Sequence, residues 1–303
     1  MLLKVAFLFA PVLLVGCGEA QPYVSEARLR HGLVIVLPGI EGRSPWSQAI
    51  CRGLDNGGVN WAIELHDWTT PGALLYNLRA EARNREKAEE LADRIVRYSL
   101  SHPGRPVLLV GQSGGGAIAA WTVGAMPPDQ KIDGVIMLAT ALSPGYILDS
   151  VLSRTRRGVV SFYSERDWML GAGTQIAGTM DGEHTASAGK TGFDVPSADN
   201  RPEAYRKLFQ IPWKKEMADT GHLGGHLTSS ARKFVATYVA PFVWMSLWDD
   251  WFVQRVLNGE AAWITSQPVS MRGGGSFRSD RGGNAGGGRV VTIGGREPKA
   301  TLR

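Results

Sequence analysis

Five short apolar runs without an alternating polar face stand in the first 163 residues. They are Leu33–Leu37, Trp61–Leu65, Val107–Val110, Val135–Leu138 and Gly158–Tyr163. Runs of this length and composition are typical of strands that are buried on both faces, as they are in a parallel sheet. The pattern therefore predicts a sheet of mostly parallel strands.

Helical periodicity appears between these runs. Apolar residues keep helical spacing over roughly 78–100, where Glu81/Arg85 and Glu90/Arg94 form i,i+4 pairs of opposite charge. A further strand is expected around Phe209–Met217, and a helix over Ala231–Ala240 that Pro241 ends. Strands that alternate with helices predict a doubly wound α/β fold with helices on both faces of the sheet.

The N-terminus is predicted to be a targeting segment. Lys4 precedes an apolar run from Val5 to Val15, which is too short to span a bilayer but suits the core of a signal peptide over residues 1–16. The run ends in Leu14-Val15-Gly16-Cys17, which resembles a bacterial lipobox. That resemblance implies that Cys17 is lipidated and becomes the first mature residue, which makes the protein exported and lipid-anchored to a bacterial membrane. An ordinary secretory signal with a coincidental cysteine is the alternative.

The two cysteines, Cys17 and Cys51, give no disulfide framework if Cys17 carries lipid. A Cys17–Cys51 bridge would require the lipobox interpretation to be wrong. The chain has no cysteine cluster of the kind that binds zinc, so no metal is expected.

Charge is unevenly distributed along the chain. The net charge is +5, and the tail from Gln267 to Arg303 holds seven basic and two acidic residues, which account for all of it. The tail also has ten of the 38 glycines and no periodic apolar pattern, so it is predicted to be disordered. We therefore expect a signal peptide over 1–16, a linker over 17–30, a folded domain over 31–265 and a Gly/Arg-rich tail over 266–303. For an exported protein the tail is expected to meet anionic surfaces rather than nucleic acid.

The sharpest motif is Gly111-Gln112-Ser113-Gly114-Gly115. It is a G-x-S-x-G sequence placed directly after a predicted strand and directly before a helical run. In this context the motif predicts a nucleophile elbow, a sharp turn that presents the Ser113 hydroxyl at the N-terminus of a helix. A glycine-rich turn that binds a phosphate, or nothing, is the alternative.

With this elbow the sequence resembles the α/β-hydrolase family over roughly residues 30–245. The resemblance implies a nucleophile, an acid and a histidine in that order along the chain. Ser113 matches the first role. Asp167, which follows the run 158–163, is the best match for the acid, with Glu165, Asp194 and Asp199 as rivals. Asp167 is also a candidate helix N-cap.

Two histidines compete for the third role. His222 and His226 both lie between the last expected strand and the helix after it. His226 is preferred because it lies against the start of the helix, but His222 stays open. The resemblance further implies an oxyanion hole, with one N–H donor from Gly114 and a second, preferably Ile40, from the loop after the first strand.

These features imply a serine hydrolase that acts on carboxylic esters through a Ser-Asp-His triad and an acyl-enzyme, without a cofactor. The expected substrate is a small-molecule or lipid-like acyl ester. The segment 139–157 is too short for a large cap domain. A non-catalytic lipoprotein that uses the same fold as a binding scaffold, and an acyltransferase or amidase with the same triad, are the alternatives.

Overall fold

Six parallel strands form one sheet in the order β2-β1-β3-β4-β5-β6. The computed structural model describes residues 21–260. The strands are β1 (Leu33–Leu37), β2 (Ala62–Leu65), β3 (Val107–Gln112), β4 (Ile132–Leu138), β5 (Thr155–Tyr163) and β6 (Leu208–Pro212). Every residue of β1, β3 and β4 is buried, which explains why these strands are largely apolar, with Gln112 and Asp133 as the polar exceptions. The predicted doubly wound α/β fold is confirmed.

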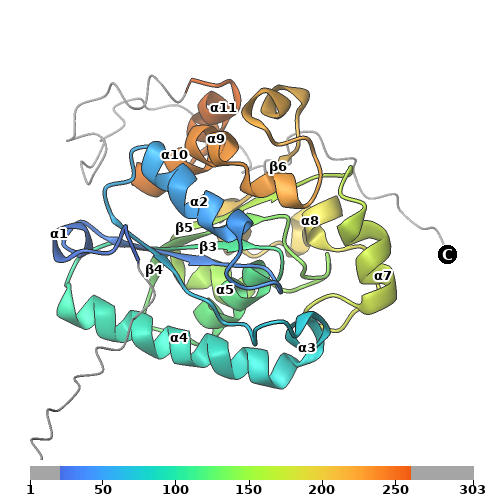
Figure 1. Ribbon diagram of the computed structural model, residues 1–303, viewed down its shortest axis with the longest axis horizontal. Coiled ribbons are helices and arrows are strands. Elements are labelled where there is room, and N and C mark those ends of the chain that lie inside the picture. Colours follow the sequence, from blue (N-terminus) through green and yellow to red (C-terminus); the bar gives the residue numbers. More distant parts are fainter. Residues whose placement is uncertain (1–20, 261–303) are drawn as a thin grey trace, which may run out of the picture.

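Helices cover both faces of this sheet (Figure 1). Helices α4 (Glu81–Ser101), α5 (Gly114–Ala125) and α6 (Asp149–Ser153) pack on one face. Helices α2 (Pro45–Asn56), α9 (Arg232–Phe234), α10 (Ala240–Trp244) and α11 (Asp250–Leu257) pack on the other. The remaining helices are short: α1 (Glu26–Leu29), α3 (Leu74–Arg79), α7 (Thr174–Ala177) and α8 (Ala188–Thr191). No helix within residues 21–260 is long and apolar enough to cross a bilayer.

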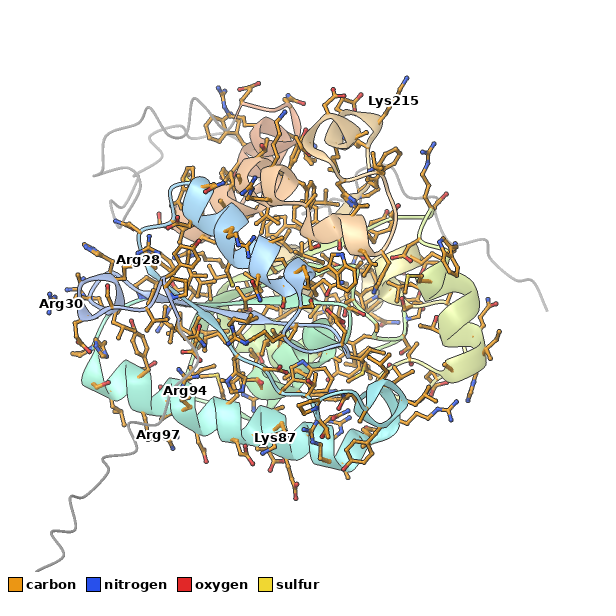
Figure 2. All side chains as sticks on the ribbon, in the orientation of Figure 1. Arg28, Arg30, Lys87, Arg94, Arg97 and Lys215 are labelled. Atoms are coloured by element: carbon orange, nitrogen blue, oxygen red, sulfur yellow. The ribbon has the colours of Figure 1, made fainter. Side chains whose placement is uncertain are left out.

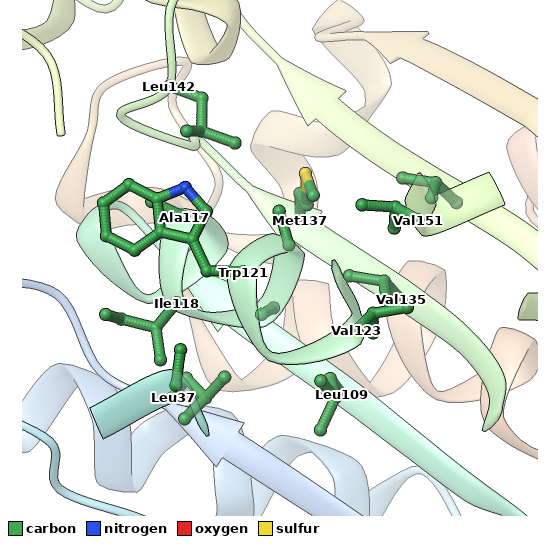
Figure 3. Packing of buried hydrophobic residues seen from close by; sticks show 14 of the residues in the cluster. Leu37, Leu109, Ala117, Ile118, Trp121, Val123, Val135, Met137, Leu142 and Val151 are labelled. Carbon is green, nitrogen blue, oxygen red and sulfur yellow. The ribbon is translucent and has the colours of Figure 1, made fainter. Parts of the chain in front are cut away.

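Helix α5 lies at the centre of the first layer. All of its residues from Gly114 to Val123 are buried. Figure 3 shows Ile118 and Trp121 of this helix among side chains that the sheet supplies, such as Leu37 and Met137. The outer helix α4 is amphipathic instead, and Lys87 and Arg97 lie on its outer side (Figure 2). A helix with no exposed face is held in place on all sides, which fixes the position of the serine at its N-terminus.

Three predicted elements differ from those observed. The helix expected over 78–100 is two helices, because Ala80 has a non-helical ψ of 61° and ends α3 before α4 begins. The last strand ends at Pro212 rather than Met217, since its partner β5 ends at Tyr163, opposite Pro212. The helical run after residue 231 does not end at Pro241. A π-helical turn over Val235–Val239 precedes α10, and Pro241 occupies the first turn of α10 directly after it.

The long connection between β5 and β6 is held to the sheet near its middle. Ser164 N donates to Gly189 O over 2.9 Å, and Gly189 N donates to Thr140 O over 2.9 Å. A side-chain carbon on Gly189 would lie 2.4 Å from the carbonyl carbon of Ala139, so only glycine fits this approach. Helix α8 therefore closes against the ends of β4 and β5.

The described part of the expected linker packs on the body of the domain. The Gln21 side chain forms two hydrogen bonds with the backbone of Leu65, and Ile63 N donates to Tyr23 O over 3.1 Å. Residues 21–30 therefore belong to the folded domain. Cys51 is buried and forms no disulfide within the described residues, and burial raises the pKa of its thiol to about 12. The signal peptide, Cys17 and the tail over 266–303 lie outside the described residues.

Candidate active site

Ser113 stands on a tight turn between β3 and α5. Its φ of 55° lies in the left-handed region, which a residue with a side chain rarely adopts. The glycines on either side permit the turn. A side-chain carbon on Gly111 would lie 2.3 Å from Gly115 O, and one on Gly115 would lie 2.2 Å from Leu37 O. The chain can therefore reverse from strand to helix only with glycine at these positions, as the motif predicted.

Ser113, His226 and Asp167 form one continuous chain of hydrogen bonds. His226 Nε2 lies 2.9 Å from Ser113 Oγ, and His226 Nδ1 lies 2.8 Å from Asp167 Oδ2. The exposed fractions of the three residues are 7% for Ser113, 7% for His226 and 1% for Asp167. The carboxylate orients the imidazole, and the imidazole is placed to accept a proton from the serine hydroxyl.

Asp167 has two structural tasks at once. Its Oδ2 contacts His226, while its Oδ1 accepts a hydrogen bond from Leu170 N over 3.0 Å at the start of the helical turn Met169–Gly173. Asp167 therefore contacts both the histidine and the start of this turn, although the residue at the N-cap position is Trp168 rather than Asp167. Glu165, Asp194 and Asp199 are exposed and make no contact with His226 in the described residues.

His222 lies behind the site rather than in it. Its Nδ1 lies 3.1 Å from Thr228 Oγ1, and its ring packs against Phe234 with 4.5 Å between centroids. Burial lowers the pKa of His222 to about 4, against a smaller raising effect of Asp167. The ring is therefore neutral at pH 7, and it supports the loop that carries His226.

Ile40 and Gly114 follow the neighbouring strands β1 and β3. The connections after these two strands lead to helices on opposite faces of the sheet, and open α/β sheets bind ligands at such a point. A side-chain carbon on Gly114 would lie 3.0 Å from Ile40 Cγ2, so the Ile40 side chain packs against Gly114. Within residues 21–260 the Ile40 N–H has no hydrogen-bond acceptor.

Side chains that sequence reasoning missed hold this loop in place. Asn77 Nδ2 donates to Ile40 O over 2.9 Å, and Trp68 Nε1 donates to Pro38 O over 2.9 Å. Both residues belong to the connection after β2 and carry no motif, so no sequence signal marked them. They hold the two peptides that flank the Gly39–Ile40 peptide, whose N–H is the predicted donor.

Glu41 is a further residue that the motif did not identify. Its Oε1 accepts a hydrogen bond from Ser44 Oγ over 3.2 Å, and its Oε2 lies over Gly39, 2.3 Å from where a side-chain carbon there would stand. Burial raises the pKa of Glu41, against the lowering effects of its own backbone N–H, of Ser44 and of His226. A carboxyl group of raised pKa thus lies in the neighbourhood of His226.

No group of three or more His, Cys, Asp or Glu side chains in the described residues is arranged to hold a metal ion. The site is instead built from a hydroxyl, an imidazole, a carboxylate and backbone N–H groups.

No family description and no curated protein sequence matches the chain. Several solved structures resemble it. One is the dienelactone hydrolase-like promiscuous phosphotriesterase P91 from metagenomic libraries, at 14% identity over 77% of this chain and 85% of that one, with a TM-score of 0.39. Another is lipase B of Aspergillus fumigatus, at 12% identity over 71% of this chain and 53% of that one, with a TM-score of 0.43.

A third solved structure is the dienelactone hydrolase of Anabaena variabilis, at 14% identity over 69% of this chain and 83% of that one, with a TM-score of 0.39. With its six parallel strands, its helices on both faces and its serine on the turn after β3, the chain has the α/β-hydrolase fold.

Proposed function

We propose that the protein is a serine hydrolase that cleaves carboxylic esters. The observation that carries the proposal is the chain of hydrogen bonds from Ser113 through His226 to Asp167. A serine hydroxyl is a weak nucleophile, and a hydrogen-bonded imidazole activates it by taking its proton as the bond to the acyl carbon forms.

In the first half of the reaction His226 Nε2 takes the Ser113 proton while Oγ attacks the ester carbonyl. The N–H groups of Ile40 and Gly114 stabilise the oxyanion. His226 then gives the proton to the leaving alcohol, and the acyl group remains on Ser113. In the second half, water attacks this acyl-enzyme with His226 as base, which releases the acid and restores the serine. Asp167 stabilises the charged imidazole throughout.

The test is covalent labelling together with turnover. A fluorophosphonate probe should label the wild-type protein and not Ser113→Ala, and p-nitrophenyl esters of graded chain length should be hydrolysed by the wild type alone. Labelling without hydrolysis of any ester, but with turnover of amides or transfer to an added alcohol, would favour the amidase or the acyltransferase alternative. If neither labelling nor turnover occurs, the non-catalytic scaffold is the better explanation.

The cellular setting is a second part of the proposal. The lipobox-like sequence that ends at Cys17 supports export and lipid anchoring, and the basic tail from residue 267 supports contact with anionic surfaces. Metabolic labelling with a fatty-acid analogue should mark the wild-type chain and not Cys17→Ser. Vesicle binding that falls with salt for the wild type, and less steeply after deletion of residues 267–303, would support the role of the tail.

A further inference from the structure

Exposed apolar side chains gather at one edge of the domain. Eight of the twelve large hydrophobic residues that are exposed in the described part of the chain lie in four segments: the start of α2, helix α3, the stretch from Trp168 to α7, and the loop that carries His226. We call these eight residues the apolar rim: Trp46, Leu74, Leu75, Tyr76, Trp168, Met169, Ile176 and Leu223. Scattered single residues of this kind are ordinary, but a concentration at one edge indicates a contact surface.

Several residues of the apolar rim lie beside the candidate active site. Trp168 directly follows Asp167, and Leu223 stands in the loop that carries His226. Helices α3 and α7, which lie side by side in Figure 1, are joined by a hydrogen bond of 3.3 Å from Arg79 Nε to Ala177 O. This contact brings the rim residues of the two helices together. The segment after α7 also reaches the site, since a side-chain carbon on Gly114 would lie 3.3 Å from Met180 Sδ.

The opposite edge of the sheet is different. Leu100, at the C-terminal end of α4, precedes the amino end of β3 and is as exposed as the rim residues, but it lies far from Ser113 along the strand direction. It provides a matched control for any effect of the rim.

The described N-terminal segment begins on the same side of the domain as part of the apolar rim. The two hydrogen bonds of Gln21 hold it at Leu65, the last residue of β2, and the rim residues Leu74–Tyr76 follow from that strand. Only residues 18–20 stand between Gln21 and Cys17, so a lipid on Cys17 keeps Gln21 within about 14 Å of the bilayer.

We propose that the apolar rim rests in the surface of a lipid bilayer, and that the site takes its ester from amphiphiles held in that surface. The naming of the substrate rests on the proposed ester hydrolysis, whereas the contact with lipid does not. The free energy falls when side chains such as leucine, isoleucine and tryptophan leave water for an interface. The serine would then meet acyl esters at the high local concentration that they have in the membrane.

The contact with lipid is tested by fluorescence on the full chain as a bacterium processes it. Leu75→Cys, Ile176→Cys and, as the control, Leu100→Cys are labelled with an environment-sensitive fluorophore and mixed with phosphatidylcholine vesicles. Wild-type protein, treated in the same way, serves as the control for background labelling of Cys17 or of the buried Cys51. We expect a blue shift at positions 75 and 176 and none at 100. An equal shift at all three positions, or no shift at the two rim positions, would overturn the proposal.

The substrate is tested separately. In the double variant Leu75→Ser/Ile176→Ser the rate on a long-chain ester embedded in vesicles, divided by the rate on a water-soluble short-chain ester, should fall at least about tenfold. Leu100→Ser should leave this ratio unchanged. An unchanged ratio in the double variant would contradict the named substrate class. If neither ester is hydrolysed by the wild type, the proposed ester hydrolysis fails, and the fluorescence result still decides the contact with lipid.

Discussion

His226 Nε2 lies 2.9 Å from Ser113 Oγ, although 113 positions separate the two residues in the chain. The sheet makes this contact possible, because the loops that follow parallel strands all begin at the same edge of the sheet, where the carboxyl ends of the strands lie. His222 and His226 are only four residues apart, but their rings have different partners. One ring faces the serine, and the other faces Thr228 and Phe234.

Substitution of each histidine should separate these two positions. His226→Gln removes the proton acceptor and should lower kcat by at least about 1,000-fold. His222→Gln should lower kcat by less than about tenfold, because this ring contacts no reacting atom. The measurement is steady-state hydrolysis of a p-nitrophenyl ester. Equal losses in the two variants would contradict the assignment of His226 as the base.

Replacement of Asp167 should affect catalysis more than stability. In Asp167→Asn the amide oxygen can still accept the hydrogen bond from Leu170 N, but the side chain no longer stabilises a charged His226. We expect kcat to fall by about 10,000-fold while the melting temperature changes little. Glu165→Gln, at an exposed neighbouring position, should retain full activity. A large loss in Glu165→Gln would mean that Glu165 is the acid.

Gly115→Ala should strongly destabilise the protein. The new methyl group would lie 2.2 Å from Leu37 O and 2.5 Å from Pro38 O, both of them backbone atoms that cannot move aside without shifting β1. We expect the free energy of unfolding to fall by more than about 2 kcal/mol in urea titrations. Gly145→Ala is the matched control, because nothing lies within 4 Å of the added carbon there.

His222 should make the protein less stable in acid. Its folded-state pKa of about 4 lies below the unfolded value of 6.5, so between these values the unfolded chain binds more protons and the stability rises with pH. This residue should contribute up to about 3 kcal/mol of the stability lost between pH 6.5 and pH 4. His222→Gln should flatten that part of the curve of unfolding free energy against pH. His31→Gln, at an exposed position, should leave the slope as it is.

Glu41 should have the opposite effect. Burial raises its pKa in the folded state, so the folded protein holds the proton more tightly and stability falls as pH rises through that folded pKa. Glu41→Gln keeps an acceptor for Ser44 Oγ and removes the charge. We expect its melting temperature to exceed that of the wild type by an amount that grows from pH 4 to pH 7. Glu86→Gln, on the exposed face of α4, should show no such trend.

The strands and the elbow were predictable because each depends on a local pattern. Continuous apolar runs indicated β1 to β5, and the glycines at 111 and 115 indicated a turn that only glycine can make. The break at Ala80 and the π-helical turn before Pro241 were not predictable, since tertiary packing decides them.

The sequence named Ser113 and Asp167 and preferred His226, but the residues that support them did not follow from it. The residues of the site come from separate loops, and spacing along the chain could not choose between His222 and His226. Asn77, Trp68 and Glu41 act through contacts with the Ile40 loop that no motif records. Their roles depend on distances across the fold rather than on residue type.

The attachment of Gly189 to the ends of β4 and β5 divides one long connection into two shorter ones. Each half begins and ends at a fixed point, so its length can change without moving the other half or the register of β6. Evolution or a protein engineer could therefore reshape the segment before residue 187, which borders the serine, while the segment after residue 192 stays as it is. The fold thus offers a place where new substrate preferences can arise at little cost to folding.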